Sequence, residues 1–393
     1  MIRTPPDRAG SALRVMFAGG TSGGHLMPGV AVAKALRELM PAARCLFLLG
    51  RRSAEDDCRG VLNGFEVADV PDTPWAGALS KALFPARCTA AAARVGRALR
   101  RFRPHVLVAL GSYNSAVPLA LARALGLPCA LFEANAVPGR LVRALAPLAD
   151  VVMLQWAGVA RRLTCRRALA TGNPVRPELF GVSRAGARDR LGLARNRFTL
   201  LALGGSQGAR GLNRLVRRAV RRIEAPLQVL HVAGNAHLED RGGESSSAIP
   251  CRTVGFLDRM EDGYAAADLV LSRAGASTLA ELTALGLPAI LVPHPYSPNR
   301  HQQANAAVLQ RAGAAIVKHQ AELTPRRLAH LVERLAADPE RLQQMAERAR
   351  RLGRPDAARR VARELAHMAG SDTNIRPVPE RMGLSEHRKL HAA

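Results

Sequence analysis

The chain is poor in aromatic side chains and in lysine. Only 4% of its 393 residues are aromatic, which leaves few flat rings for stacking on single-stranded nucleic acid. The net charge is nevertheless +26 and comes almost wholly from arginine, because lysine occurs only at Lys34, Lys81, Lys318 and Lys389. Such an excess of positive charge favours anionic partners such as phosphate groups and acidic lipid surfaces. The composition therefore argues against nucleic acid as a partner.

Long apolar runs and paired cysteines are also missing. No run approaches the roughly 20 apolar residues that a membrane-spanning helix needs, and the first 13 residues lack the apolar core of a signal peptide. The six cysteines form no CxxC pair, which argues against a structural zinc site and indicates reduced thiols in the cytosol. We expect no metal and no cofactor, and only peripheral contact with a membrane.

Short apolar runs alternate with longer amphipathic stretches in two successive series. This pattern is typical of parallel strands that lead into loops and then helices. The first series of predicted strands comprises residues 14–18, 45–49, 106–110, 129–132 and 151–154. The second comprises residues 198–203, 227–232, 269–271, 289–292 and 315–317. The sequence thus predicts an α/β protein with two doubly wound sheets, which the length also allows.

A polar, arginine-rich stretch after residues 172–177 separates the two series. We place the boundary near Arg184, with an N-terminal domain over residues 14–183 and a C-terminal domain over 184–353. Three helical patterns close the chain, over residues 324–337, 339–352 and 355–369. We expect the last of them to complete the first domain. The ends, 1–13 and 371–393, and the loop 242–247 lack apolar periodicity and are expected to be disordered or mobile.

The first predicted strand leads into a glycine-rich turn that ends in a histidine. The glycines of residues 19–24 let the backbone approach a ligand closely, and parallel sheets bind ligands at the carboxyl ends of their strands. An imidazole, with an unperturbed pKa of about 6.5, suits a general base for an acceptor hydroxyl, which makes His25 the catalytic candidate. The alternative is a histidine at a helix entry, near Pro28 or Gly29, that only bonds to the backbone.

The second series opens on another glycine-rich turn, residues 204–210 (GGSQGAR). Its backbone amides precede a helix, where unpaired N–H groups and the helix dipole favour an anion, and Ser206 adds a hydroxyl donor. The turn lacks the lysine and the spacing of a Walker A motif, which disfavours ATP hydrolysis. No Asp-x-Asp metal motif is present. We therefore expect a phosphate site that does not depend on a metal.

Two further segments carry polar groups at predicted strand ends. In residues 272–281 the carboxylate of Glu281 lies about one helical turn after small residues, where it can accept both ribose hydroxyls. A capping box formed by Ser277 or Thr278 with Glu281 is the alternative. In residues 299–305 the amide of Gln302 can donate to and accept from sugar hydroxyls, although such residues also serve as ordinary helix caps.

Taken together, the motifs resemble the lipid I to lipid II N-acetylglucosaminyltransferases of bacterial peptidoglycan synthesis. The similarity extends over residues 14–369, and each motif alone is unspecific, whereas their order is specific. The matching segments are residues 18–25, 111–113, 133–135, 172–176, 204–210, 272–281 and 301–305. The resemblance implies a GT-B fold: two Rossmann-like doubly wound parallel-sheet domains facing a cleft, the first for the lipid-linked acceptor and the second for UDP-N-acetylglucosamine.

The resemblance also implies roles for single residues. Leu257 would hold the uracil through its backbone and Glu281 the ribose. The diphosphate would lie among Ser206, Arg176 and residues 276–278, and the sugar near Gln302 and Asn135. The implied donor-binding set is Ser22, Gly23, Gly24, Asn135, Arg176, Ser206, Leu257, Ala276, Ser277, Thr278, Leu279, Ala280, Glu281 and Gln302, with His25 as the catalytic base.

The implied reaction is an inverting displacement in which the C4 hydroxyl of the acceptor attacks the anomeric carbon as UDP leaves. The chain departs from the family pattern on the acceptor side, where Phe132 and Ala134 flank Glu133 in place of polar residues and Ser112 replaces a usual glycine. The hydroxyl of Ser22 is kept. The acceptor is therefore less firmly predicted than the donor.

An apolar segment with adjacent cations suggests contact with anionic lipid. Residues 75–85 (WAGALSKALFP) precede Arg87, Arg94, Arg97, Arg100, Arg101 and Arg103. In the family this region is associated with the membrane, which implies a peripheral protein at the cytoplasmic face of the inner membrane. A buried loop followed by a solvated basic helix is the alternative.

Three other functions remain open at this point. The chain could be a GT-B transferase with another lipid or small-molecule acceptor. It could be a UDP-N-acetylglucosamine 2-epimerase, although we identify no acid and base placed on the donor sugar. It could also be a basic scaffold that binds acidic lipid or nucleic acid without catalysis, its motifs being vestigial. UDP binding that resists salt would argue against the scaffold.

Overall fold

The computed structural model describes residues 12–20, 23–50, 60–72, 84–204, 209–234 and 249–370. Their contacts form two compact units. Unit 1 contains the chain up to Ala134, then Pro138–Pro174 and the segment from Asp356, and unit 2 contains Asn135–Val137 and Val175–Pro355. The chain thus changes unit at Pro174, whereas we had expected the boundary near Arg184. The tails 1–11 and 371–393 and the loop 242–247, for which we had predicted disorder or mobility, lie outside the described residues.

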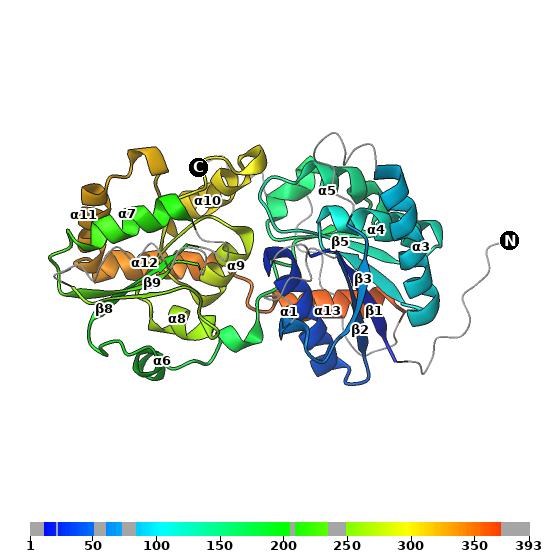
Figure 1. The fold of residues 1–393 in the computed structure, drawn as a ribbon, viewed down its shortest axis with the longest axis horizontal. Helices are drawn as coiled ribbons and strands as arrows, with labels where there is room; N and C mark the ends of the chain where they lie inside the picture. Colours follow the sequence, from blue (N-terminus) through cyan, green and yellow to red (C-terminus); the bar gives the residue numbers. More distant parts are fainter. Residues whose placement is uncertain are drawn as a thin grey trace. The chain divides into compact units, whose positions relative to one another are not determined.

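Unit 1 is built on a parallel sheet with the strand order β3-β2-β1-β4-β5-β6-β7 (Figure 1). The strands are β1 (Arg14–Ala18), β2 (Arg44–Gly50), β3 (Glu66–Val70), β4 (Val106–Ala109), β5 (Cys129–Glu133), β6 (Val151–Leu154) and β7 (Ala168–Leu169). The helices are α1 (Gly23–Leu39), α3 (Phe84–Phe102), α4 (Ala116–Ala124), α5 (Arg140–Leu145) and α13 (Ala357–Met368).

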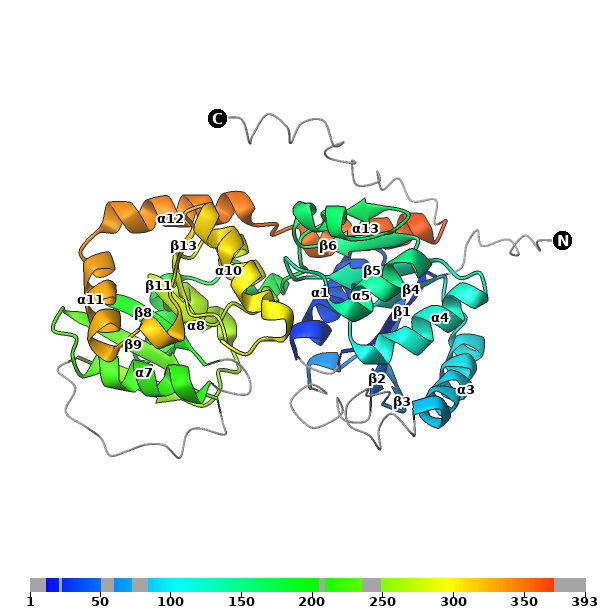
Figure 2. The same ribbon diagram turned by 90° about the horizontal axis from the view of Figure 1, so that it is seen from above.

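The two faces of this sheet are covered by different helices because side chains alternate along each strand. Val15 and Phe17 of β1 pack with residues of α1 and α13, while Met16 and Ala18 pack with residues of α3, α4 and α5. Both views show α13, the last helix, beside the sheet of the first unit (Figure 2). Burial of both faces explains why the central strands read as continuous apolar runs.

Unit 2 repeats the design with a parallel sheet in the order β10-β9-β8-β11-β12-β13. The strands are β8 (Phe198–Leu203), β9 (Leu227–Val232), β10 (Cys251–Val254), β11 (Leu269–Ser272), β12 (Ala289–Leu291) and β13 (Ala315–Val317). The helices are α6 (Arg184–Arg190), α7 (Arg210–Val220), α8 (Met260–Ala266), α9 (Ala276–Leu285), α10 (His301–Arg311), α11 (Pro325–Ala336) and α12 (Pro339–Leu352). The predicted pair of doubly wound sheets is confirmed.

All ten predicted strands occur, but three described strands were missed. These are β3, β7 and β10, and each lies at the edge of its sheet. An edge strand contacts only one neighbour and exposes more of its side chains, so its sequence need not be apolar throughout. The pattern of β3 shows this, since only its last residue, Val70, is fully buried.

The helix ends also depart from expectation in one place that matters for the site. Helix α1 begins at Gly23 and contains Pro28, whereas we predicted a start at Pro28 or Gly29. The misplacement arose because we treated the glycines as turn residues and the proline as a first-turn residue. Gly23 and Gly24 instead form the first turn of α1, where backbone N–H groups lack acceptors inside the helix.

Helix α13 is grouped with unit 1 by its contacts. It packs on α1, Arg359 pairs with Glu38 at 3.2 Å, and the fully buried Glu364 accepts a 2.6 Å hydrogen bond from Arg167 beside β7. Among the helices that the structure describes, none combines the length and the apolar character needed to cross a bilayer.

Candidate active site

Two glycines with positive φ angles follow β1 at the carboxyl edge of the unit 1 sheet. Gly19 and Gly20 follow β1 with φ angles of 98° and 110°, in a region that side chains disfavour. A Cβ on Gly19 would lie 2.6 Å from the hydroxyl of Ser112, which accepts a 3.2 Å hydrogen bond from the Gly20 N–H. Ser112, which departs from the family pattern, is buried and thus braces the turn.

His25 lies in the first turns of α1 and is half-buried. Its Nδ1 lies 3.2 Å from the carbonyl oxygen of Leu110, just after β4. Because a carbonyl can only accept, this contact places the ring proton on Nδ1 and the lone pair of the neutral ring on Nε2. The contact fits both interpretations of the sequence, since a backbone bond at one nitrogen is also how a catalytic histidine is oriented.

Other polar groups at this edge are held by backbone and amide partners. Asn114 donates to Asp72 at 2.7 Å, and Glu133 accepts a 2.9 Å hydrogen bond from the Gly139 N–H. Phe132, one of the departures, is only 6% exposed and packs in the core with residues of α1. The aromatic ring therefore replaces a polar group in the interior of unit 1 and is not presented at its surface.

Unit 2 places a carboxylate between a phenol and a guanidinium. Glu281 of α9 accepts a 2.7 Å hydrogen bond from the hydroxyl of Tyr264 in α8, and its other oxygen lies 3.7 Å from Nη2 of Arg176. Burial raises the pKa of Glu281, while Arg176 and the Tyr264 hydroxyl act in the opposite direction. Burial and the neighbouring carboxylate raise the pKa of Tyr264 well above its usual value. The phenol therefore remains a donor.

The start of α9 decides between the two interpretations of Glu281 that involve a capping box or a ligand. Its N-cap is Gly275, without a side-chain capping bond, so Glu281 is not part of a capping box with Ser277 or Thr278. Ala276, Ser277 and Thr278 form the half-buried first turn. Leu279 and Ala280, which the sequence included in the donor-binding set, are buried, and the Leu279 N–H bonds to the Gly275 carbonyl.

Two arginines of unit 2 carry buried N–H donors at their Nε atoms. Nε of Arg176 and Nε of Arg273 are buried and have no hydrogen-bond partner in the part of the chain that the structure describes. Arg273 follows β11, and its terminal nitrogens donate to two neutral acceptors, the Val292 carbonyl at 3.0 Å and the Gln320 side chain at 2.6 Å. Burial lowers the pKa of Arg273. An anion would satisfy such donors and offset a cost of about 1–3 kcal/mol for each.

A buried asparagine that our sequence reasoning gave no role holds the segment that contains Asn135. Asn305 of α10 is fully buried, accepts from the Ala136 N–H at 2.7 Å and donates to the Asn135 side chain at 3.1 Å and to the Ala274 carbonyl at 3.2 Å. It therefore fixes the segment Asn135–Val137 within unit 2. Its place inside the motif 301–305 was the only sequence signal.

Gln302 has one end of its amide occupied. Its Oε1 accepts a 2.8 Å hydrogen bond from the His294 N–H, which follows β12. The amide nitrogen is therefore the end that can donate to a ligand. The sequence left both directions open, and only the fold selects one.

The segment after β10 presents an aromatic ring that the sequence reasoning missed. Phe256 is 56% exposed, while its neighbour Leu257 is half-buried and approaches Gly263, where an added Cβ would lie 3.0 Å from Leu257 Cδ1. An exposed aromatic directly after a strand end is a signal that could have been recognised, since a ring there can stack on a base.

Two of the predicted site residues, Ser22 and Ser206, lie outside the described residues. Within the described ranges no group of three or more His, Cys, Asp or Glu side chains is placed to hold a metal ion. Of the six cysteines, the five that the structure describes are free thiols, and burial raises the pKa of Cys45 and of Cys129 to about 12.

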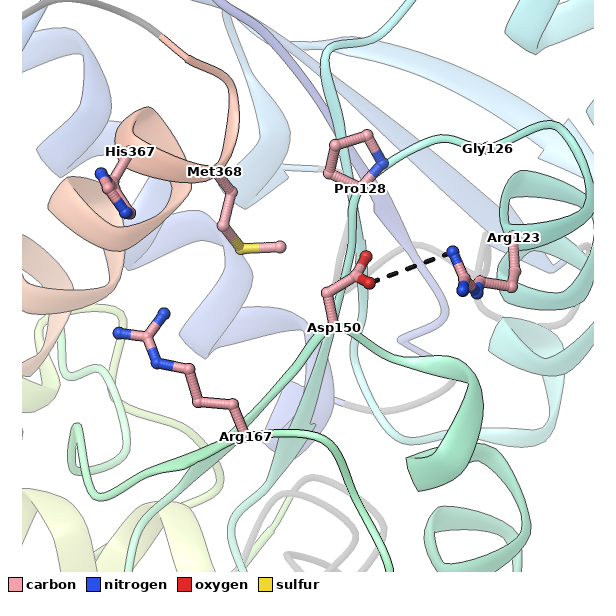
Figure 3. A pocket seen from close by; sticks show the side chains of 7 residues that line it. All are labelled: Arg123, Gly126, Pro128, Asp150, Arg167, His367 and Met368. Carbon is pink, nitrogen blue, oxygen red and sulfur yellow. Dashed lines mark ion pairs between the residues drawn. The ribbon is translucent and has the colours of Figure 1, made fainter. Parts of the chain in front are cut away.

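One described cavity lies away from these edges, at the amino ends of β5, β6 and β7 (Figure 3). Its volume is about 370 Å³ and it is lined by Arg123, Gly126, Pro128, Asp150, Arg167, His367 and Met368. Asp150 pairs with Arg123 at 4.0 Å and with Arg166 at 3.2 Å, and Arg167 pairs with Glu364. These charges are compensated within the protein, and parallel α/β sheets bind ligands at the opposite edge.

Comparison with known proteins identifies both halves of the chain. Residues 15–154 match the glycosyltransferase family 28 N-terminal domain, and residues 199–361 match the glycosyltransferase family 28 C-terminal domain. Two similar proteins carry the name UDP-N-acetylglucosamine–N-acetylmuramyl-(pentapeptide) pyrophosphoryl-undecaprenol N-acetylglucosamine transferase. The one from Halothermothrix orenii is 34% identical over 87% of this chain and 95% of its own length. The one from Nitrosococcus oceani is 38% identical over 91% of this chain and 99% of its own.

Solved structures agree with this match. The crystal structure of Acinetobacter baumannii MurG has a TM-score of 0.70 and 26% identity, covering 89% of this chain and 98% of that one. A UDP-N-acetylglucosamine 2-epimerase structure has a TM-score of 0.65 but only 14% identity, so it shows the shared fold alone. The predicted GT-B fold is confirmed.

Proposed function

The chain belongs to the family of the UDP-N-acetylglucosamine–N-acetylmuramyl-(pentapeptide) pyrophosphoryl-undecaprenol N-acetylglucosamine transferases, and on this premise we propose that it converts lipid I into lipid II. The donor is UDP-N-acetylglucosamine. The acceptor is the C4 hydroxyl of the N-acetylmuramoyl-pentapeptide carried on undecaprenyl diphosphate. The product carries the new sugar with inverted configuration at its anomeric carbon.

The observation that carries the proposal is the group of Glu281, Tyr264 and Arg176 at the carboxyl edge of the unit 2 sheet. A buried carboxylate with lone pairs to spare suits the two hydroxyls of a ribose. The buried Nε donors of Arg176 and Arg273, which have no acceptor among the described residues, suit a diphosphate, as does the first turn of α9 over Ala276–Thr278. Buried Leu279 and Ala280 then support the site by packing.

The remaining donor contacts follow from the same unit. The backbone of Leu257 would meet the uracil edge, with Phe256 available to stack on the ring. Gln302 would donate its amide N–H to the sugar, and Asn135 would lie beside it, held by Asn305. Ser206 completes the diphosphate set in the proposal on the grounds of its sequence motif alone.

Unit 1 would supply the chemistry on the acceptor. The C4 oxygen of the acceptor forms a bond to the anomeric carbon while the bond from that carbon to the UDP oxygen breaks. The hydroxyl proton passes to Nε2 of His25, whose Nδ1 contact with the Leu110 carbonyl supports this role. Gly23 and Gly24 begin α1, and the backbone N–H groups of a first helical turn can donate to the leaving diphosphate. Ser22 is included in the proposal on the grounds of its sequence motif alone. The arginines of unit 2 stabilise the charge that develops on UDP.

A transfer assay tests the proposal. Radiolabelled UDP-N-acetylglucosamine is incubated with a short-chain lipid I analogue, beside a reaction without acceptor. We expect labelled product only when the acceptor is present. UDP binding without any transfer would refute the lipid I assignment, while keeping the donor, and would point to another acceptor for this GT-B enzyme.

We also propose peripheral binding to anionic lipid at the cytoplasmic face of the inner membrane. Support comes from α3, whose exposed side chains include Arg94, Arg97 and Arg101. The apolar part of the proposed contact, residues 75–83, lies outside the described residues.

The membrane proposal makes a quantitative prediction. Each arginine near an anionic surface contributes about 1 kcal/mol, so the double variant Arg97→Gln, Arg101→Gln is expected to lower affinity for phosphatidylglycerol vesicles roughly 30-fold. Vesicle flotation at fixed salt measures this, with phosphatidylcholine vesicles as control. The double variant Arg341→Gln, Arg351→Gln on α12 removes the same two positive charges at another place and is the matched control. Equal flotation of the α3 variant and the wild type would rule out α3 as the contact.

A further inference from the structure

The buried phenol of Tyr264 has no part in the reaction described above, yet it makes the shortest described contact to the proposed ribose-binding carboxylate. Its ring lies in α8 and is 3% exposed, and its hydroxyl donates to Glu281 Oε2 at 2.7 Å. A residue needed only for packing would be served as well by phenylalanine. The hydroxyl therefore needs an explanation that packing does not provide.

We propose that Tyr264 is a positioning residue that makes Glu281 selective for ribose over 2′-deoxyribose in the nucleoside diphosphate. The inference rests on the proposed function, because it assumes that Glu281 receives the ribose hydroxyls. It goes further by assigning the sugar selectivity of the site to a side chain that touches no ligand.

The geometry explains how this works. A carboxylate has about four lone-pair sites, and one of them is taken by the Tyr264 hydroxyl. This bond fixes the rotation of the carboxyl group, which is otherwise broad for the last torsion of a glutamate. Oε1, on the side of Arg176, and the second lone pair of Oε2 are then aimed in constant directions. Two neighbouring hydroxyls can be bound together only if both acceptor directions are fixed.

The ionisation of Glu281 also depends on Tyr264. An ionised carboxylate offers acceptor sites on both oxygens, whereas protonation turns one oxygen into a donor. Burial of Glu281 opposes ionisation by raising its pKa. The Tyr264 hydroxyl and Arg176 are the two groups that act against this burial, one from α8 and the other from the segment before residues 177–179. Tyr264 itself does not compete as an anion, because its own pKa is raised well above the usual value.

The test measures binding of UDP and of 2′-deoxy-UDP by calorimetry to the full chain. The wild type is expected to prefer UDP. Tyr264→Phe keeps the ring and removes one hydrogen bond to a charged group, so we expect UDP affinity to fall about 10-fold while affinity for 2′-deoxy-UDP changes less than about 2-fold. The preference for ribose should therefore largely disappear.

Two further variants keep the result interpretable. Thr283→Val removes another buried hydroxyl, on α9 itself, whose hydrogen bonds among the described residues go to the helix carbonyls of Leu279 and Ala280. It should leave the preference unchanged. Glu281→Gln should abolish the preference, and adding Tyr264→Phe to it should cause no further loss, because the two residues act through one contact.

The possible failures are distinguishable. A wild type that binds UDP and 2′-deoxy-UDP equally would overturn the ribose role of Glu281 in the proposed function, and the inference with it. A wild type that prefers UDP beside a Tyr264→Phe variant with the same preference would overturn the inference alone. Equal losses for both ligands in Tyr264→Phe, or the same change in Thr283→Val, would assign Tyr264 a purely structural role.

Discussion

The carboxyl edges of the two sheets are built on one plan but differ in charge. In unit 2 the edge carries Arg176 and Arg273, with buried donors that have no acceptor in the described chain. In unit 1 the groups at the edge are a histidine and the carboxylates Asp72 and Glu133, which accept from an amide and from the backbone. The same fold therefore suits anion binding at one edge and proton transfer at the other.

This difference indicates that donor binding and proton transfer from the acceptor are carried out by different units. In the proposed mechanism, the arginine donors of unit 2 hold the diphosphate in its ground state and stabilise its added charge when it leaves. An oriented imidazole acts only on the proton of the acceptor. Substitutions at the unit 1 edge should therefore change turnover, and substitutions at the unit 2 edge should change binding.

The largest effect is expected at the unit 1 edge. His25→Ala should lower kcat about 1,000-fold, within the range for loss of a general base, with little change in UDP affinity. Transfer rates and UDP calorimetry on the same preparation measure this. His367→Ala removes an imidazole from the opposite end of unit 1 and serves as the control. Parallel losses of turnover and UDP affinity in His25→Ala would contradict the separation of tasks.

The next effect concerns the stability of unit 2 in acid. His231 is buried, and its Nε2 lies 3.1 Å from Oδ1 of Asn213, whose amide nitrogen donates to the Ala233 carbonyl. Nε2 is therefore the donor, and a second proton on Nδ1 would have no acceptor in the described chain. Burial, aided by the charge of Arg217, lowers the pKa of His231 from 6.5 to about 4.

The sign of the pH dependence follows from this shift. Below about pH 6.5 the unfolded chain takes up a proton that the folded chain refuses, so stability is lost as the pH falls toward about 4. The loss is about 3 kcal/mol for the shift of His231. Thermal unfolding followed from pH 7 to pH 4 should show a weaker pH dependence in His231→Gln than in the wild type. Identical slopes would show that His231 does not carry the effect.

A smaller effect is expected for the buried cation of unit 2. Arg273→Gln should weaken UDP binding about 30-fold, since a charge-assisted contact is worth about 2 kcal/mol, while uridine, which has no diphosphate, should bind as before. Calorimetry with both ligands checks this, and the exposed Arg341→Gln is the charge control. An equal loss for uridine would mean that Arg273 supports the fold of the site and not the anion.

The smallest effect should come from the exposed aromatic. Phe256→Ala should weaken uridine and UDP equally, by about 5- to 10-fold, because stacking on a base contributes about 1 kcal/mol or more. Pyrophosphate, measured as a competitor of UDP binding to the variant and the wild type, should be unaffected. A loss confined to UDP would place Phe256 near the phosphates and overturn its stacking role.

Several features could be predicted from the sequence because they depend on local pattern. The interior strands were found because burial on both faces demands unbroken apolar runs, as in β8. The edge strands β3, β7 and β10 were missed for the opposite reason. The ordered motifs singled out His25, Glu281 and Gln302 as candidates, since strand ends of parallel sheets meet at one edge.

Only the tertiary structure decided which partners the candidate site residues contact. The sequence could not choose between a capping box and a ligand role for Glu281, because its partners Tyr264 and Arg176 are distant along the chain and are brought together by α8, α9 and the segment before residues 177–179. Nor could it assign Asn305, the direction of the Gln302 amide, or the interior position of Phe132. Local pattern fixes which segments form strands and helices, whereas hydrogen bonds between distant segments exist only once the sheet has formed.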